Sequence, residues 1–318
     1  MARILANDGI SEAGKAIIEN AGHEVVTEKI EQADLLSQLN NFDGIIVRSA
    51  TTVRKDLIDA CPNLKFIGRA GVGLDNIDVA YAKEKGKHVA NTPAASSESV
   101  AELAIAHMFA AYRFLHESNR DMPAKGQTEF NALKKAYSKG KELSGKTLGI
   151  IGGGRIGIET MKRAIGLGMK VVYFDPNLNE ISFLLDLHPS MTSNKVEIKL
   201  TAVSLDELLA SSDIISLHVP NIGRYILAEE EFAKMKDGVV LINCARGGTV
   251  KEEAMLNALN AGKVAAVGVD VFENEPTNNI TLLQHSKASL TPHIGGSTIE
   301  AQDRIGTQMA DQVVEFFK

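Results

Sequence analysis

The sequence predicts an α/β protein built from two doubly wound domains, each on a parallel sheet. Three observations carry this prediction. Short apolar runs alternate with helix-like segments along most of the 318 residues, a rhythm typical of parallel sheets with crossover helices. The rhythm restarts after Lys146, where a glycine-rich turn follows the first strand of a second series. The chain is also long enough for two domains with separate cores.

The composition excludes several classes of protein. The formal net charge is −6, from 34 basic and 40 acidic residues, whereas nucleic-acid binders normally carry a basic excess or stripe. No apolar run approaches the roughly 18 residues of a membrane span, and the N-terminal MARILAND begins a strand rather than a signal peptide. The two cysteines, Cys61 and Cys244, lack the spacing of a disulfide framework or a zinc site. We therefore expect a cytoplasmic protein with no metal and no nucleic-acid or membrane partner.

The first part of the chain predicts the first parallel sheet. Its strands are expected at Arg3–Asn7, Glu24–Thr27, Gly44–Arg48, Leu64–Gly68 and His88–Asn91, and its helices at Ser11–Asn20, Glu31–Leu39, Arg54–Ala60 and Asp78–Lys85. A long alanine-rich helix over Ser96–Leu115 follows; it is apolar on most faces, which predicts deep burial. Residues 121–146 are polar and lysine-rich, which predicts a loose excursion before the second series.

The second series extends from Lys146 to about residue 290. Six strands are expected there, the number in a complete dinucleotide-binding sheet: Thr147–Ile151, Val171–Phe174, Ile198–Ala202, Ile214–Val219, Val239–Asn243 and Ala265–Val271. The tail of the chain is expected to return to the first sheet. The predicted domains are residues 1–93 with 294–318, which bind substrate on a flavodoxin-like fold, and residues 94–293, which bind the cofactor.

The turn after the first strand of this series predicts dinucleotide binding on a Rossmann-like domain. Gly152-x-Gly154-x-x-Gly157 joins that strand to a helix, and the next strand ends at Asp175. Gly152 permits a tight turn, Gly154 admits a diphosphate to the helix N-terminus, and Gly157 lets helix and strand pack closely. Asp175 would bind the adenosine ribose and repel a 2′-phosphate, which favours NAD over NADP. The alternative is a glycine turn that binds nothing.

Charged side chains follow three successive strands of the second series. Arg246 follows the strand Val239–Asn243, the pair Glu273 and Glu275 follows Ala265–Val271, and His293 follows a further short strand at Ala288–Leu290. These side chains would therefore lie at one edge of a parallel sheet. An arginine there can bind the carboxylate of a 2-keto or 2-hydroxy acid. A histidine can exchange the hydroxyl proton, and one of the acids can orient the imidazole. The alternatives are a loop arginine, solvated acids and a structural histidine, which is how most of the other seven histidines are interpreted.

Positive charge also gathers at strand ends in the first domain. Arg48 and Arg69 end two strands, and Arg54 begins the helix after the first of these. Such a cluster in an otherwise acidic chain favours a substrate with more than one negative charge, such as a phosphorylated acid. A glycine turn after Arg69 would offer free N–H groups to an anion. Ordinary surface arginines are the alternative. The other substrate-binding candidates at these strand ends are Ser49, Val72 and Gly73.

Seven segments together identify the chain as a member of a known family. It resembles the D-isomer-specific 2-hydroxyacid dehydrogenases over nearly its full length, in RSATTV (48–53), GRAGVGLDNID (68–78), NTPAASSESVAELAIAHM (91–108), GKTLGIIGGGRIG (145–157), INCARGG (242–248), VGVDVFENEP (267–276) and TPHIGGST (291–298). Within the family, RSAT and GRAGVGLDNID are similar to the phosphoglycerate branch. The resemblance implies two α/β domains with the active site in a cleft, NAD as cofactor, and a small phosphorylated 2-hydroxy acid as substrate.

The resemblance also implies roles for individual residues. Arg246 would bind the substrate, Glu275 would pair with the histidine, and His293 would be the acid/base. Asp270 would hold the nicotinamide carboxamide, with Gly295 beside the ring. The remaining cofactor positions are Arg155 and Ile156 at the pyrophosphate, His218, Val219 and Pro220 at the adenine, and Cys244 and Ala245 before the catalytic arginine.

On the substrate side, Val72 and Gly73 resemble backbone donors to the carboxylate, and Arg48 and Arg69 resemble cations that face the phosphate. The helix at Ser96–Leu115 resembles the family's dimerisation element, which implies a homodimer or a dimer of dimers. Lys134 or Lys135 would match a basic residue delivered by the neighbouring subunit.

We therefore expect NAD-dependent oxidation of 3-phospho-D-glycerate to 3-phosphohydroxypyruvate, the first step of phosphorylated serine biosynthesis. Two alternatives stay open: a glyoxylate or hydroxypyruvate reductase or other D-2-hydroxyacid dehydrogenase, and a non-catalytic NAD-sensing interaction protein. Residues 177–200 and 221–224 depart in length from the family pattern, close to the adenosine side. Because the chain ends at Lys318 directly after the returning helix, we expect no serine-binding regulatory domain.

Overall fold

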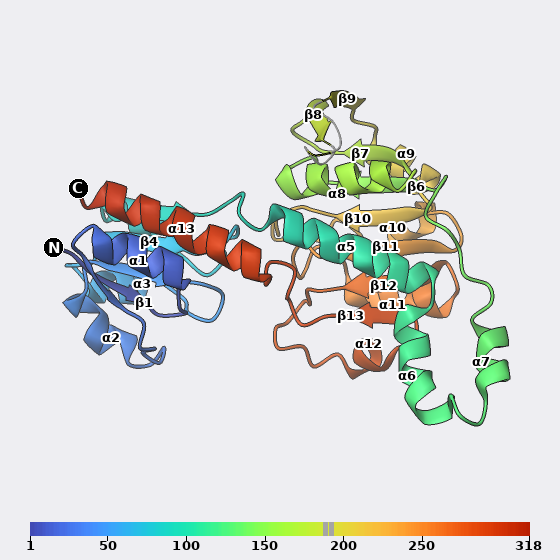
Figure 1. Ribbon diagram of the computed structural model, residues 1–318, viewed down its shortest axis with the longest axis horizontal. Coiled ribbons are helices and arrows are strands. Elements are labelled where there is room, and N and C mark those ends of the chain that lie inside the picture. Colours follow the sequence, from blue (N-terminus) through green and yellow to red (C-terminus); the bar gives the residue numbers. More distant parts are fainter. Residues whose placement is uncertain (187–189, 191–193) are drawn as a thin grey trace. The chain divides into compact units, whose positions relative to one another are not determined.

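The computed structural model describes residues 1–186, 190 and 194–318, and the chain divides into two units (Figure 1). Unit 1 comprises Met1–Ser99 and Gly296–Lys318, and unit 2 comprises Val100–Gly295. Each unit is a parallel sheet covered by helices. The fold prediction is confirmed: both units are Rossmann-like, and the second is inserted into the chain of the first.

Unit 1 has five parallel strands in the order β2-β1-β3-β4-β5, which is the flavodoxin-like order. The strands are β1 Arg3–Ala6, β2 Glu24–Val26, β3 Gly44–Val47, β4 Phe66–Arg69 and β5 His88–Asn91, and all five match predicted strands. Val47 pairs with Arg69, so β3 and β4 end together at one edge of the sheet.

Helices cover both faces of this sheet. The elements are α1 Glu12–Asn20, α2 Leu35–Gln38, η1 Leu39–Asn41, α3 Lys55–Ala60, α4 Val79–Glu84 and α13 Ile299–Phe316. On one face, α1 and α13 lie side by side (Figure 1). Their close approach requires glycine, because a Cβ on Gly14 would lie 2.5 Å from the carbonyl oxygen of Gly306. The chain therefore returns to its first sheet through α13.

Unit 2 has six parallel strands in the order β13-β12-β11-β10-β6-β7. The strands are β6 Thr147–Ile151, β7 Lys170–Phe174, β10 Ile214–Leu217, β11 Val239–Asn243, β12 Val264–Val269 and β13 Ala288–Leu290. The strand order reverses between β6 and β10, and open parallel sheets bind their ligands at this kind of switch point. The central strands β10 and β11 are buried along their whole length.

The helices of unit 2 form two layers. One face of the sheet is covered by α5 Ser97–Tyr112 and α8 Arg155–Gly166. The other face is covered by α9 Leu205–Ser211, α10 Glu229–Lys234, α11 Glu252–Asn260 and α12 Ile280–Gln284. The two remaining helices, α6 Leu115–Lys125 and α7 Phe130–Ala136, extend away from the sheet (Figure 1).

Of the two predictions for the segment before β6, one is confirmed and one is wrong. The helix predicted over Ser96–Leu115 is α5, Ser97–Tyr112. It ends before Phe114, whose backbone adopts the left-handed conformation with φ 55, and α6 begins at the next residue. The predicted loose excursion over residues 121–146 includes the end of α6 and the whole of α7. The composition is polar because α6 buries none of its residues, not because the backbone lacks structure.

The assignment of Ile198–Ala202 to the six-stranded sheet is also wrong. β9 (Lys195–Thr201) pairs antiparallel with β8 (Glu180–Asp186) in a separate two-stranded sheet. A partner this close in sequence costs little loop-closure entropy. The sixth strand of the large sheet is instead β13, Ala288–Leu290, which is the short strand expected before His293.

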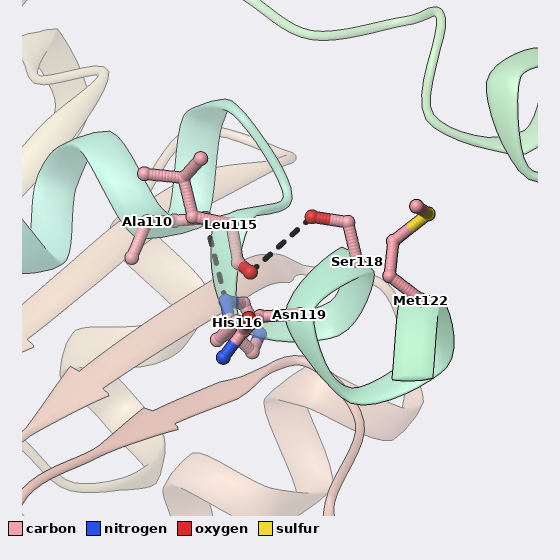
Figure 2. A pocket seen from close by; sticks show the side chains of 6 residues that line it. All are labelled: Ala110, Leu115, His116, Ser118, Asn119 and Met122. Atoms are coloured by element: carbon pink, nitrogen blue, oxygen red, sulfur yellow. Dashed lines mark hydrogen bonds between the residues drawn. The ribbon is translucent and has the colours of Figure 1, made fainter. Parts of the chain in front are cut away.

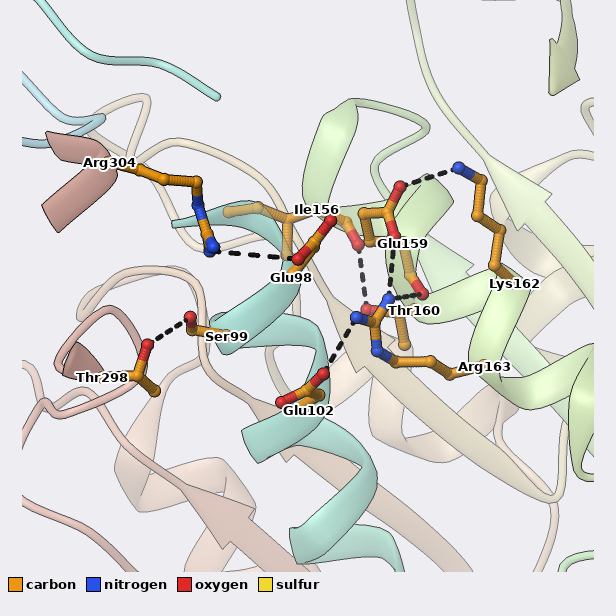
Figure 3. Close-up of polar contacts among 10 residues, drawn as sticks. All are labelled: Glu98, Ser99, Glu102, Ile156, Glu159, Thr160, Lys162, Arg163, Thr298 and Arg304. Carbon is orange, nitrogen blue, oxygen red and sulfur yellow. Dashed lines mark hydrogen bonds and ion pairs between the residues drawn. The ribbon is translucent and has the colours of Figure 1, made fainter. Parts of the chain in front are cut away.

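Polar side chains anchor segments within each unit (Figure 3). In unit 1, the hydroxyl oxygens of Ser99 and Thr298 lie 2.8 Å apart, next to the start of α13. In unit 2, Arg163 of α8 donates to Glu159 on its own helix at 2.8 Å and to Glu102 of α5 at 3.0 Å. Because Glu102 is exposed, this bridge orients α8 on α5 more than it stabilises the fold.

Candidate active site

Two glycines of the turn after β6 differ in the space around them: Gly154 leaves room for a phosphate, and Gly152 does not. Gly152 has φ +107, and a Cβ there would lie 2.5 Å from the carbonyl oxygen of His218. Gly154 is the N-cap residue of α8, and a Cβ there would meet nothing within 4 Å. The amides of Arg155 and Ile156 begin the helix beside this space. Helix N-terminal amides next to open space fit the diphosphate of a dinucleotide.

Gly157 packs against this turn, and a Cβ there would overlap the carbonyl oxygen of Gly152. Asp175 ends β7 beside the same turn and accepts hydrogen bonds from the amides of Gly153 and Asn177, both at 2.9 Å. The carboxylate therefore helps to fix the turn, which the sequence did not reveal. Since a carboxylate has about four acceptor sites, Asp175 keeps capacity for ribose hydroxyls, and that role stays a prediction.

His218 follows β10, the neighbour of β6. Its amide donates to the carbonyl oxygen of Ile151 at 2.8 Å, and its Nε2 lies 2.9 Å from Ser216 Oγ. Burial lowers the pKa of His218 to about 3, so the ring is neutral near pH 7. The side chain of Val219 also approaches Gly152. This segment, which continues to Pro220, therefore lies beside the glycine turn, as its predicted adenine-side role requires.

The strands β11, β12 and β13 are neighbours, and the segments that follow them are joined by backbone hydrogen bonds. The amide of Asp270 donates to Asn243 at 3.0 Å, and the amide of His293 donates to the carbonyl oxygen of Asp270 at 2.8 Å. The residues predicted to carry the chemistry thus lie at one edge of one sheet.

Glu275 pairs with His293 at this edge. His293 Nδ1 and Glu275 Oε2 are 2.6 Å apart, and the amide of Phe272 donates to Glu275 Oε1 at 3.1 Å. Burial opposes ionisation of Glu275, but the hydrogen bonds from His293 and Phe272 and the nearby charge of Arg246 outweigh it and lower the pKa of this carboxyl. An ionised carboxylate can only accept, so Nδ1 carries a proton and Nε2 is left to act as the base.

The other acid considered from the sequence, Glu273, has a different partner. Its Oε1 accepts a hydrogen bond from the amide of Glu252 at 2.9 Å, and the carboxylate of Glu252 accepts one from the amide of Glu273 at 2.8 Å. This reciprocal pair ties the start of α11 to the segment that carries Glu275.

Arg246 lies on the loop after β11, which is held by hydrogen bonds between its own residues. Its carbonyl oxygen accepts hydrogen bonds from Thr249 Oγ1 at 2.7 Å and Asn243 Nδ2 at 3.3 Å, and its Nη1 donates to Ala245 at 2.7 Å. Cys244 is buried, and burial together with the charge of Asp270 raises the pKa of its thiol well above the ordinary value. The thiol is therefore neutral, and only the arginine brings charge to this loop.

Asp270 has a role that the sequence did not reveal. Its side chain is 1% exposed, and Oδ1 accepts hydrogen bonds from Thr291 Oγ1 at 2.6 Å and the amide of Ile294 at 2.8 Å. Oδ2 accepts one from the amide of Gly295 at 2.9 Å. The carboxylate therefore holds the turn that carries His293. Oδ2 keeps a second acceptor site, and the predicted contact with the nicotinamide carboxamide stays a prediction.

The turn held by Asp270 is strained at its centre. His293 has φ 53, a left-handed conformation that costs a non-glycine residue on the order of 1–3 kcal/mol. Backbone strain of this kind persists only where the surroundings over-determine it. Here four hydrogen bonds to Asp270 do so, three to the carboxylate and one to the carbonyl oxygen.

In unit 1, Arg48 and Arg69 lie at the shared edge of β3 and β4. The amide of Arg48 donates to Asp8 at 2.6 Å, and Arg69 Nη1 donates to the carbonyl oxygen of Ala70 at 3.0 Å. Arg48 forms no ion pair with any residue in the part of the chain that the structure describes. The amides of Val72 and Gly73 likewise donate to no described group, which fits an anion-binding turn.

Two other predicted positions on the substrate side differ in their surroundings. Arg54 Nη1 pairs with Asp78 at 3.0 Å, and Nη2 donates to the carbonyl oxygen of Asp75 at 3.0 Å. This ion pair gives Arg54 a structural partner, so its charge is already matched within unit 1. Ser49 is exposed beside Arg48.

Unit 2 has a pocket of about 510 Å³ at the corner between α5 and α6. Figure 2 shows its lining, in which His116 lies below Leu115 and beside Asn119, with Ser118 and Met122 to the right. His116 Nε2 lies 2.9 Å from the carbonyl oxygen of Ser286. None of the predicted site residues lines this pocket, and Lys134 and Lys135 are exposed on the neighbouring α7.

Comparison with known proteins decides the family. The family model that matches residues 105–295 is "D-isomer specific 2-hydroxyacid dehydrogenase, NAD binding domain". A hydroxypyruvate reductase of Thermotoga maritima is 44% identical over 317 residues, which cover 98% of this chain and 97% of that relative. This chain belongs to the D-isomer-specific 2-hydroxyacid dehydrogenases. It is an NAD-dependent enzyme, and the alternative of a non-catalytic NAD sensor is set aside.

Two further relatives carry the name of the phosphoglycerate branch. A D-3-phosphoglycerate dehydrogenase of Methanocaldococcus jannaschii is 40% identical over 315 residues, which cover 98% of this chain but 57% of that relative. The structure of an NAD+-bound 3-phosphoglycerate dehydrogenase of Entamoeba histolytica matches with a TM-score of 0.78 and 29% identity, covering 99% of this chain and 95% of that one.

The described part of the dehydrogenase contains no helix with the length and apolarity needed to cross a membrane. Nor does any group of described His, Cys, Asp or Glu side chains have the arrangement of a metal site.

We predict that Gly154→Asp abolishes cofactor binding without unfolding the protein. Aspartate is a favoured N-cap residue, and its Cβ enters open space, so the fold is kept. Its charge would lie where the diphosphate binds, and like charges about 4 Å apart repel by ~4 kcal/mol at an intermediate dielectric. The Kd for NADH, measured by fluorescence titration, should rise roughly 10²–10³-fold. Gly154→Asn is the neutral control and should bind more tightly than Gly154→Asp; equal Kd values for wild type and Gly154→Asp would contradict the assignment.

We also predict that His218 makes the protein less stable in acid. The pKa of an unfolded histidine is 6.5 and that of His218 in the fold is about 3, so the unfolded chain binds more protons between these values. The contribution is therefore complete above pH 6.5 and is lost as pH falls towards 3. Between pH 7 and pH 5 the loss of unfolding free energy due to His218 should amount to about 2 kcal/mol. His218→Gln should reduce the fall in unfolding free energy over this range, measured by denaturant titration; an unchanged fall would show that His218 is not buried as a neutral ring.

Proposed function

We propose that this dehydrogenase oxidises 3-phospho-D-glycerate to 3-phosphohydroxypyruvate with NAD, as the first step of phosphorylated serine biosynthesis. The observation that carries the proposal is the pair Arg48 and Arg69 at neighbouring strand ends, beside a turn with available amides at Val72 and Gly73. Such a cluster suits a substrate that bears a phosphate and a carboxylate. The proposal does not depend on Arg54, whose charge is matched by Asp78.

The proposed chemistry uses the residues at the edge of the second sheet. Arg246 binds the substrate carboxylate and polarises the oxygen on the reacting carbon. His293 accepts the hydroxyl proton at Nε2. Glu275, bonded to Nδ1 at 2.6 Å, then faces an imidazolium and stabilises it. NAD, when bound, accepts the hydride. In the reverse direction His293 donates the same proton.

The remaining site residues are proposed to hold the cofactor. The space beside Gly154 and the helix amides that follow it suit the diphosphate. Asp175 is proposed to bind the ribose, and Oδ2 of Asp270 the carboxamide. The other proposed cofactor positions are Gly152, Arg155, Ile156, Gly157, His218, Val219, Pro220, Cys244, Ala245 and Gly295.

A hydroxypyruvate reductase is the second candidate. One observation favours it: the relative with that name matches along 97% of its own length, whereas the phosphoglycerate dehydrogenase of M. jannaschii matches along 57%. An unphosphorylated substrate would need fewer cations, and the ion pair of Arg54 with Asp78 is in keeping with this.

We further propose that the enzyme is cytoplasmic and assembles as a homodimer or a dimer of dimers. The support for assembly lies on α6 and α7, where large apolar side chains are exposed: Leu115 at 52%, Met122 at 43% and Phe130 at 56%. Apolar residues grouped on projecting helices are typical of protein interfaces. Lys134 or Lys135, on the same projection, is proposed to reach the neighbouring subunit's site.

A substrate panel tests the proposed substrate. We expect kcat/KM for 3-phosphohydroxypyruvate, followed by NADH consumption, to exceed that for hydroxypyruvate and glyoxylate by at least tenfold. Arg48→Gln should lower kcat/KM for the phosphorylated acid by roughly tenfold or more, because a charged hydrogen bond contributes about 1.5–3 kcal/mol, and should leave the unphosphorylated acids nearly unchanged. A preference for hydroxypyruvate that Arg48→Gln does not alter would replace the first candidate with the second.

A further inference from the structure

We propose that His107, in the middle of α5, is a positioning residue that holds the turn of His293 through Thr291 and Asp270. The inference rests on the proposed role of His293 as the acid/base. No signal in the sequence suggested it, because a single histidine on an apolar helix is most often a core residue.

His107 joins α5 to two hydroxyl groups beyond it. Its side chain is 3% exposed. Nδ1 lies 2.9 Å from Ser289 Oγ on β13, and Nε2 lies 3.1 Å from Thr291 Oγ1 just after that strand. Thr291 Oγ1 in turn donates to Asp270 Oδ1 at 2.6 Å. A continuous chain of hydrogen bonds therefore runs from α5 to the carboxylate that holds the catalytic turn.

The directions of these bonds follow from the number of protons available. The Asp270 carboxylate accepts from several donors, so the single hydroxyl proton of Thr291 is used on Asp270. Thr291 Oγ1 can then only accept from His107, and Nε2 must carry the proton. A neutral imidazole has one N–H, so Nδ1 accepts from Ser289. Burial lowers the pKa of His107 to about 4, in agreement with a neutral ring near pH 7.

A glycine on the neighbouring strand leaves the space that the His107 side chain occupies. Gly268 of β12 faces His107, and a Cβ on that glycine would lie 2.5 Å from the Cβ of His107. The missing side chain lets α5 approach β12, which Asp270 directly follows, closely enough for the chain of hydrogen bonds to form. A larger residue at Gly268 would displace the helix or the ring.

The proposed consequence for catalysis is that His107 keeps the side chain of His293 in position. Thr291 can hold one rotamer only while it both donates to Asp270 and accepts from His107. Without the Nε2–H donor, Thr291 and the Asp270 carboxylate can rotate, and the left-handed backbone at His293 loses support. A displacement of about 1 Å at a reacting group can cost on the order of 10² in rate.

His107→Leu and His107→Gln test the inference together. The leucine removes the donor, and we expect kcat to fall roughly ten- to hundredfold while the Kd for NADH and the KM for substrate change little. In His107→Gln the amide nitrogen can take the place of Nε2 and donate to Thr291, so we expect kcat within about threefold of wild type. If both variants lower only the thermal midpoint and leave kcat unchanged, His107 is a core residue and the inference is wrong.

A matched pair of threonine variants tests the middle of the chain. Thr291→Val should lower kcat as His107→Leu does, and the double variant should be no worse than either alone, because both changes break one connection. Thr307→Val is the control: Thr307 is partly buried like Thr291, but its hydroxyl donates to the carbonyl oxygen of Asp303 on its own helix at 2.9 Å. It should keep the wild-type kcat; additive losses for His107 and Thr291 would overturn the proposed connection.

His293→Gln separates this inference from the proposed mechanism. If His293→Gln keeps the wild-type kcat, the role of His293 is wrong and the inference fails with it. If His293→Gln is inactive while His107→Leu has the wild-type kcat, the mechanism stands and only the positioning role is lost.

Discussion

The candidate site depends on one buried carboxylate. Asp270 receives two backbone amides and one hydroxyl from the turn that carries His293, and a charge this deep needs such partners. The same contacts hold His293 in a left-handed conformation and set the direction in which its ring meets Glu275. Other parts of unit 2 support this arrangement. The parallel strands bring the ends of β11, β12 and β13 to one edge, and His107 of α5 is linked to the carboxylate through Thr291.

Much of the fold could be predicted because parallel strands between amphipathic helices have a strong sequence pattern. The five strands of unit 1 and the glycine turn after β6 are of this kind. The errors occur where that pattern does not apply. Ile198–Ala202 pairs with a neighbour in sequence rather than with the large sheet, and Phe114 ends α5 before the predicted boundary through a backbone conformation that no residue type marks.

The residues of the site could be predicted where their type and their place after a strand were enough to identify them. Three groups at successive strand ends indicated the candidate catalytic edge, and family resemblance, not spacing, chose Glu275 over Glu273 as the partner of His293. Sequence could not show which polar groups are used internally: Arg54 pairs with Asp78, and Asp175 fixes the glycine turn. These pairings are made by residues distant in the chain, and they appear only once the strands are placed.

The most direct test of the account is a double-mutant cycle on the pair at the centre of the site. His293→Gln, Glu275→Gln and the double variant would be compared by kcat with NAD and the preferred substrate. If the two residues act as one acid/base unit, His293→Gln alone should cost roughly 10²–10⁴ in rate, and adding Glu275→Gln should cost little more. Full additivity of the two losses, or a His293→Gln variant with near-normal kcat, would contradict the assignment.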